Sequence, residues 1–143
     1  MVITFDSETL RLMAYFKQAT RVSCRDCFEA NGTLVFTTEP KETGLAIGKG
    51  GMNRNALENS LHKKVKILGY ADNPVELTKN FLMPMQATEV SLSSEDGKDV
   101  IKIQLPSPRE RRILLSNNIE NLKLLKAIVA RYFPGIANIL VLQ

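Results

Sequence analysis

The sequence predicts an α+β protein built from two consecutive units with the same order of elements. The chain has 143 residues, enough for one ordinary domain or two small ones. Hydrophobic residues make up 44% and charged residues 24%, as in globular proteins, which excludes wholesale disorder and collagen-like architecture. A β-β-α-α-β pattern recurs at an offset of about 67 residues, so the second half repeats the first.

The first unit is expected to open with a helix and a hairpin. Asp6 fits a helix N-cap, and apolar residues at helical spacing follow it up to Ala19. The alternating pattern of residues 21–38 predicts a β-hairpin, because Asn31-Gly32 accepts the positive φ angles of a type I′ turn.

A pair of helices follows, joined by a glycine-rich segment. Pro40 fits the start of a short helix over residues 40–47, which ends at the tetrad Gly48-Lys49-Gly50-Gly51. A strand over residues 65–70 closes the unit. Between them, the second helix is expected to bury an apolar stripe made of Met52, Ala56, Leu57 and Leu61.

The second unit is expected to follow a turn at residues 72–74 and a short connecting helix over residues 74–81. The two predicted domains therefore span residues 1–72 and 73–143. The remaining elements are expected as strands over 87–93 and 99–105 around a Glu95-Asp96-Gly97 turn, helices over 108–115 and 119–133, and a last strand over 136–142.

The net charge of +4 gathers around the tetrad, because residues 41–66 hold six cations against two carboxylates and the rest of the chain is neutral. Glycine backbone reaches positive φ and allows close approach, while the N–H groups and the dipole at a helix start favour a negative oxygen. The tetrad therefore predicts a phosphate-binding site. Its surrounding cations are Lys41, Lys49, Arg54, Lys63, Lys64 and Lys66.

Other interpretations of the tetrad compete with this one. In the simplest, the glycines only permit a tight turn and the lysines form a solvated face. A Walker loop needs four residues between its first glycine and the Gly-Lys pair, whereas three separate Gly44 from Gly48, and Gly50 stands where the hydroxyl is required. The dinucleotide fingerprint needs a glycine where Asn53 stands. Neither nucleotide-binding loop fits.

The segment Ile47-Gly48-Lys49-Gly50-Gly51, placed between two helices, resembles the G-x-x-G loop of a prokaryotic-type, or type II, KH domain. Two such units in tandem, filling almost the whole chain, resemble the short archaeal relatives of the transcription factor NusA. The resemblance implies two tandem type II KH domains, each a three-stranded mixed sheet with helices packed on one face.

The resemblance also implies that single-stranded RNA lies across the first unit. The RNA backbone would meet the tetrad, and the bases would lie over an apolar groove near Ile47, Leu57 and Ile67, although the helical spacing of Leu57 favours the core. The RNA-binding residues that the resemblance implies are Ile47, Gly48, Lys49, Gly50, Gly51, Asn53, Arg54 and Lys66.

The second unit is expected to bind phosphate poorly. Its equivalent turn, at about residues 115–118, has neither glycine nor cation, and side chains there would obstruct close backbone approach. The unit either holds RNA by side-chain charge or serves as a rigid packing partner. The charges concerned are Arg109, Arg111, Arg112, Lys123, Lys126 and Arg131.

The remaining residues predict no catalytic site, metal site or cofactor. Cys24, Cys27 and the distant His62 are too few for a structural zinc, so one cysteine is expected in the core and one outside it. His62 is expected at the surface or as a helix cap. No membrane span or secretory signal is found, so the cytoplasm is the expected compartment.

Together these observations favour a non-enzymatic RNA-binding protein that acts in transcription termination or antitermination, as the NusA resemblance implies. Contact with RNA polymerase is implied by the resemblance alone. RNA binding in RNA processing or ribosome assembly is the alternative, and a nucleotide-binding enzyme or a protein-interaction scaffold fits the residues less well.

Overall fold

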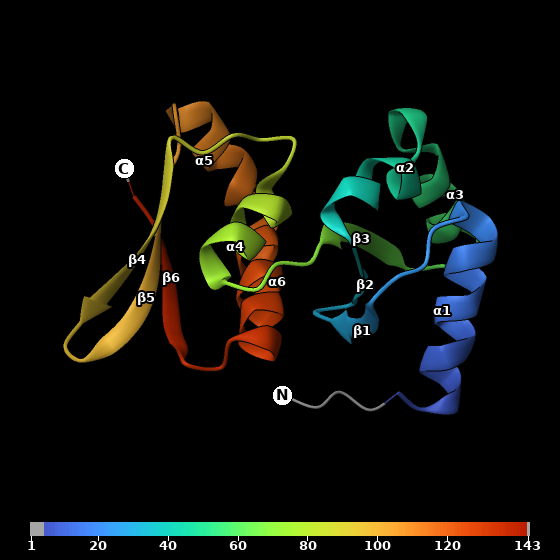
Figure 1. The fold of residues 1–143 in the computed structure, drawn as a ribbon. Helices are drawn as coiled ribbons and strands as arrows, with labels where there is room; N and C mark the ends of the chain where they lie inside the picture. Colours follow the sequence, from blue (N-terminus) through green and yellow to red (C-terminus); the bar gives the residue numbers. More distant parts are fainter. Residues whose placement is uncertain (1–4, 143) are drawn as a thin grey trace. The chain divides into compact units, whose positions relative to one another are not determined.

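The computed structural model describes residues 5–142, apart from the side chains of residues 116–119. The chain forms two compact units, Met1–Tyr70 and Ala71–Gln143, called unit 1 and unit 2 below. Each unit has the order α-β-β-α-α-β and its own three-stranded sheet (Figure 1). The fold is therefore α+β with two three-stranded mixed sheets and packed helices, as predicted.

Unit 1 begins with a helix capped by Asp6, whose side chain accepts the Thr9 N–H at 2.7 Å. Its sheet has the order β1-β2-β3, with β1 antiparallel and β3 parallel to β2. Asn31 and Gly32 have φ angles of 49° and 75°, as the predicted hairpin turn requires. The elements are α1 (Ser7–Thr20), β1 (Asp26–Ala30), β2 (Thr33–Thr38), the 3₁₀ turn η1 (Pro40–Glu42), α2 (Thr43–Ile47), the 3₁₀ turn η2 (Lys49–Gly51), α3 (Met52–Leu61) and β3 (Lys64–Gly69).

Unit 2 repeats this order in full, because the helix expected as a connection takes the place of α1. Asn73 accepts the Glu76 N–H at 2.8 Å, the same N-cap geometry that Asp6 provides. The sheet order is β4-β5-β6, again with one antiparallel and one parallel pair. The elements are α4 (Pro74–Leu82), β4 (Glu89–Glu95), β5 (Lys98–Gln104), α5 (Pro108–Leu114), α6 (Ser116–Tyr132) and β6 (Ile136–Val141).

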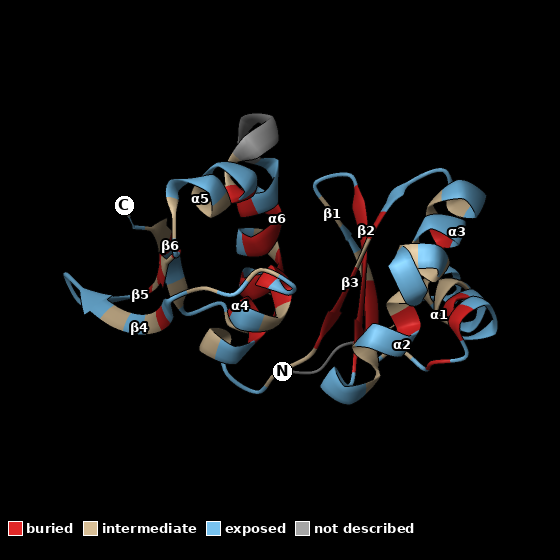
Figure 2. Ribbon diagram, turned by 90° about the horizontal axis from the view of Figure 1, so that it is seen from above, coloured by how far each residue is buried: buried red, intermediate tan, exposed pale blue. Residues whose placement is uncertain are grey.

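The core of unit 1 lies between its helices and one face of its sheet, where the buried residues of Figure 2 gather. The rings of Phe16 and Phe36 stack with centroids 4.5 Å apart and join α1 to β2. This core fixes α2 and α3 on the sheet and thereby holds the tetrad between them. Its buried members are Phe16, Val22, Cys27, Leu34, Phe36, Ala46, Leu57, Val65 and Ile67.

The hairpin is shorter than predicted, since residues 21–25 lie outside both strands. Arg21 ends α1 in the left-handed conformation, with φ 65° and ψ 17°, and turns the chain toward β1. Val22 is only 1% exposed and enters the core as a single anchor. The prediction was wrong here because one buried residue beside a helix end has the same spacing signal as a strand.

The apolar stripe of α3 is narrower than predicted. Leu57 is buried and Leu61 packs against the core, whereas Met52 is 65% exposed and Ala56 is also exposed. Residues four apart share a helix face, so Met52 and Ala56 lie together on a face that the sheet does not cover. The prediction was wrong for these two residues because α3 buries a single narrow face.

Candidate functional site

The tetrad joins α2 to α3 through left-handed backbone. The φ angles of Gly48, Gly50 and Gly51 are 84°, 63° and 78°, a region that glycine enters without steric cost. Gly48 donates its N–H to the Gly44 oxygen at 3.1 Å, and Gly51 donates to the Gly48 oxygen at 3.0 Å. Within the described chain, no hydrogen bond uses the N–H groups of Lys49 and Gly50, so two amide donors remain for a ligand.

Gly50 and Gly48 need to be glycine for different reasons. A Cβ built on Gly50 has no neighbour within 4 Å, so this position faces open space. A Cβ on Gly48 would lie 2.9 Å from the backbone nitrogen of Asn53, closer than real Cβ contacts. Gly48 therefore permits the close approach of α2 and α3, while Gly50 leaves the outer side of the turn bare.

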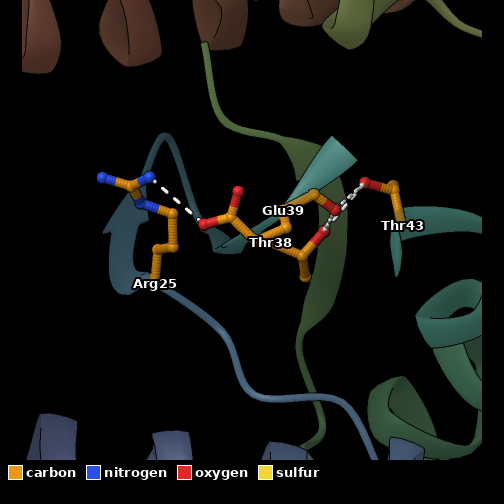
Figure 3. A network of polar contacts seen from close by, with 4 residues as sticks. All are labelled: Arg25, Thr38, Glu39 and Thr43. Atoms are coloured by element: carbon orange, nitrogen blue, oxygen red, sulfur yellow. Dashed lines mark hydrogen bonds and ion pairs between the residues drawn. The ribbon is translucent and has the colours of Figure 1, made fainter. Parts of the chain in front are cut away.

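A polar network fixes the segment that leads into α2 (Figure 3). The hydroxyls of Thr38 and Thr43 lie 2.8 Å apart, and each donates to the Glu39 carbonyl oxygen, at 3.1 and 3.3 Å. The Glu39 carboxylate pairs with Arg25 at 3.2 Å, and the Arg25 guanidinium lies 4.0 Å from the centroid of the Tyr70 ring. The network ties the end of β2 to the first residue of α2.

Arg54 is oriented by its neighbours on α3. Its Nη1 pairs with the Glu58 carboxylate at 3.3 Å, and its Nη2 donates to the Asn55 side-chain oxygen at 3.1 Å. The same Glu58 oxygen accepts the Val65 N–H of the edge strand β3 at 2.8 Å. Glu58 thus connects α3 to β3 beside Arg54, a role that the sequence analysis missed, although the i,i+4 spacing of Arg54 and Glu58 signalled their pairing.

Five of the six cations around the tetrad fall into two groups. Arg54 pairs with Glu58, and Lys63 pairs with Glu29. Three exposed lysines make no salt bridge within the part of the chain that the structure describes. These lysines, which keep their charge available for an anion, are Lys41, Lys49 and Lys64.

Lys66 differs from the exposed lysines because it is largely buried. It lies in β3 between Val65 and Ile67, which point into the core, so it extends from the opposite face of the strand. Burial, and to a smaller extent the positive charge of Arg54, lower the pKa of Lys66 to about 8. Lys66 and Arg54 therefore lie within electrostatic range of each other.

The apolar groove was expected near Ile47, Leu57 and Ile67. Leu57 and Ile67 are 1% and 4% exposed and belong to the core, where their side chains meet other protein atoms. Ile47 is partly buried and packs against the same cluster. Leu57 therefore packs in the core, as its helical spacing indicated, and the apolar groove expected near these residues stays a prediction.

The equivalent junction in unit 2 has a different backbone. The described residues there show no glycine turn: α5 ends at Leu114, Leu115 has φ −96° and ψ 7°, and α6 begins at Ser116. The predicted turn at about residues 115–118 was therefore wrong, since its backbone is the first turn of a helix that starts earlier than expected. The expectation that side chains block this turn concerns residues 116–119, whose side chains lie outside the described structure.

The two cysteines and His62 are the other residues that the sequence analysis considered. Cys27 is buried and Cys24 is half-buried, both are free thiols, and burial raises the pKa of Cys24 to about 11. His62 is exposed and ends α3 as its C-cap, as expected. In the described residues no group of His, Cys, Asp and Glu is arranged to hold a metal ion, and no helix combines the length and apolar character of a membrane span.

The similar proteins described here share one name. No family model matches the chain. A protein of Methanocaldococcus jannaschii named "Probable transcription termination protein NusA" is 28% identical over 91% of this chain and 70% of its own length. Its namesake in Methanococcus vannielii is 25% identical over 97% of this chain and 79% of its own length.

A solved structure supports the fold. The crystal structure of APE1850 matches with a TM-score of 0.77 and 21% identity, over 96% of this chain and 100% of that chain. Two consecutive α-β-β-α-α-β units, with a G-x-x-G sequence in the first, are consistent with tandem KH domains. Over more than 90% of its length, the chain is a homologue of the archaeal proteins named NusA.

Proposed function

We propose that this NusA-like chain is a transcription termination or antitermination factor that binds single-stranded RNA through the G-x-x-G tetrad of unit 1. The observation that carries the proposal is the open left-handed turn, which presents two amide donors beside the exposed, unpaired Lys49. The proposed RNA-binding residues are Ile47, Gly48, Lys49, Gly50, Gly51, Asn53, Arg54 and Lys66.

The chemistry of the tetrad suits a nucleic-acid backbone. Amide N–H groups at a helix start and a mobile cation both favour a phosphate oxygen, and the bare Gly50 allows a sugar-phosphate chain to approach closely. Lys41 and Lys64 add charge on the flanking segments. Sequence-independent phosphate contacts of this kind predict modest base preference.

The role in transcription is supported by the relatives, whose names refer to transcription termination. These names favour transcription over RNA processing or ribosome assembly, which the same loop chemistry would also serve. The proposed activity is binding, and it requires no catalytic residue and no cofactor. The proposed setting is the cytoplasm, and RNA polymerase is proposed as a partner by resemblance alone.

The test is a double substitution in the tetrad with a matched control. Lys49→Asp with Gly50→Asp places side chains on the bare turn and reverses its charge, so binding to short single-stranded RNA should be lost while helix and strand content stays unchanged. Lys98→Asp with Gly97→Asp makes the same chemical change at another exposed turn, where Gly97 has φ 77° and open space around it. The control should keep most of its RNA affinity, and equal losses in both variants would reject the site.

Salt provides a second measurement on the unaltered protein. Phosphate contacts release counterions, so the logarithm of the RNA association constant should fall linearly with the logarithm of salt concentration, with a slope of about −0.7 per neutralised phosphate on single strands. The tetrad variant should show a shallower slope than the control variant. An RNA affinity that does not respond to salt would point to a mode of binding without phosphate contacts.

A further inference from the structure

One polar contact across the helix pair recurs in both units. In unit 1 the side-chain amide of Asn53 donates to the Leu45 carbonyl oxygen at 3.4 Å, and in unit 2 Asn121 donates to the Ile113 carbonyl oxygen at 3.5 Å. Each donor stands eight residues after its acceptor. The contact therefore joins the last turn of the first helix to the beginning of the second in both halves of the chain.

In unit 1 this contact spans the tetrad. Leu45 precedes the tetrad and Asn53 follows it, so the side-chain amide closes a loop of backbone around the glycines. The Cβ position of Gly48 lies 3.0 Å from Cγ and 3.1 Å from Nδ2 of Asn53. The Asn53 side chain thus occupies the space that any side chain at position 48 would need.

The contact in unit 2 shows that this hydrogen bond does not depend on the glycine turn. There, helical backbone replaces the glycine turn, yet the amide-to-carbonyl bond is present. A contact that persists when the loop differs is a property of the helix pair. Its consequence for a ligand arises only in unit 1, where the segment it encloses is the left-handed turn with available amides.

We infer that Asn53 is a positioning residue, whose amide holds α2 against α3 and keeps the N–H groups of Lys49 and Gly50 directed outward for RNA. The inference rests on the proposed function, because it concerns the same loop. It refines the role proposed above for Asn53: this residue contributes to RNA binding through the geometry of the loop, and its side chain does not itself contact RNA.

The first test compares Asn53→Leu with Asn121→Leu, because leucine has a similar size and cannot donate a hydrogen bond. We expect Asn53→Leu to weaken binding to a short single-stranded oligoadenylate about tenfold, the scale of one hydrogen bond, and Asn121→Leu to leave it within about twofold. In the RNA-free protein, the amide NMR signals of Lys49 and Gly50 should shift in Asn53→Leu alone. Unshifted signals in that variant would overturn the inference. They are the result expected if Asn53 only contacts RNA and does not shape the loop of the RNA-free protein.

A double-mutant cycle with Gly50→Asp gives the decisive result. If Asn53 acts through the loop, Asn53→Leu should add little once Gly50→Asp has blocked the turn. Additive losses would show a separate RNA contact and overturn the inference. Asn53→Ala serves in the same cycle if the leucine variant does not fold, and an unchanged RNA affinity in Asn53→Ala would equally overturn it. If Lys49→Asp with Gly50→Asp leaves RNA binding intact, the proposed function itself fails.

Discussion

The two helix junctions make the same connection with different backbones. In unit 1 the chain passes from Leu45 to Asn53 through a turn with three positive φ angles, all at glycine. In unit 2 it passes from Ile113 to Asn121 through Leu115 and the first turn of α6. Right-handed helical backbone is open to every residue type, whereas a left-handed turn strongly favours glycine.

The surrounding scaffold is much more alike than the junctions. Counted from the two asparagines, Leu57 corresponds to Leu125, and these residues are 1% and 0% exposed. Glu58, which bonds to the edge strand of unit 1, corresponds to Lys126. The core and the helix caps recur in both units, so the repeated fold explains them. The glycine turn and its charged neighbours are found in unit 1 and not at the equivalent place in unit 2, so the packing of the fold does not require them.

Truncation of the corresponding leucines should have the largest effect and should be similar in both units. Leu57→Ala and Leu125→Ala each remove a fully buried side chain and leave a cavity, which should lower the free energy of unfolding by about 2–5 kcal/mol. Chemical denaturation of the two variants would measure this. A small loss in one variant alone would mean that its unit is packed less tightly than its partner.

Alanine at the two tetrad glycines should separate structure from binding. Gly48→Ala meets Asn53 at 2.9 Å and has φ 84° with ψ 163°, so it should lower the free energy of unfolding by about 1–3 kcal/mol. Gly50→Ala has open space and should cost about 1 kcal/mol, mainly from its positive φ.

Gly50→Ala should weaken RNA binding although it costs less stability than Gly48→Ala. The new methyl group of Gly50→Ala lies on the outer side of the turn, so RNA affinity should fall although the fold is nearly intact. Thermal unfolding and RNA titration of both variants would check this. A fully stable Gly48→Ala would show that α2 and α3 can separate without cost, contrary to the close contact at Asn53.

Lys66 should lower the stability of unit 1 near neutral pH. When the two sheets are aligned on their hairpin turns, Val35 pairs with Lys66 and the corresponding Val100 pairs with Asn138, so this position carries no charge in unit 2. Because the folded-state pKa of about 8 lies below the ordinary 10.5, the unfolded chain binds the proton more tightly. Lys66→Leu should therefore raise the free energy of unfolding at pH 7 by about 1–3 kcal/mol.

The pH dependence supplies the check on Lys66. Its destabilising contribution is complete below pH 8 and disappears as the pH rises from 8 to 10.5, so the advantage of Lys66→Leu should shrink over that interval. Urea unfolding at pH 7 and at pH 10 would measure the difference. An advantage that stays constant with pH would assign the effect to packing.

The helix caps should give the smallest effect and one that differs between the units. Hydrogen bonding from Thr9 lowers the pKa of Asp6 below its ordinary 3.8, so its contribution to α1 is present above that value and is lost as the pH falls through the lowered pKa. Asn73 caps α4 without titrating. Asp6→Asn should reduce the acid sensitivity of the fold, and Asn73→Asp should increase it, as measured by thermal unfolding in acid. Unchanged acid sensitivity in both variants would show that the caps do not couple to pH.

Interactions between residues close together in the sequence were sufficient to predict many features of this protein. The Asp6 cap, the Asn31-Gly32 turn and the glycine tetrad were predictable because each depends on residues within a few positions of one another. The repeat of elements and the α+β fold class follow from the same local signals.

Tertiary packing decided what spacing could not. Val22 and Met52 both looked like members of regular apolar patterns, yet one became a lone core anchor and the other stayed exposed. The hydrogen bond from Val65 to Glu58 depends on how α3 meets the sheet. The close contact between Gly48 and Asn53 depends on how α2 meets α3. Burial is set by all the neighbours that surround a side chain in three dimensions, and residues distant along the chain supply most of them.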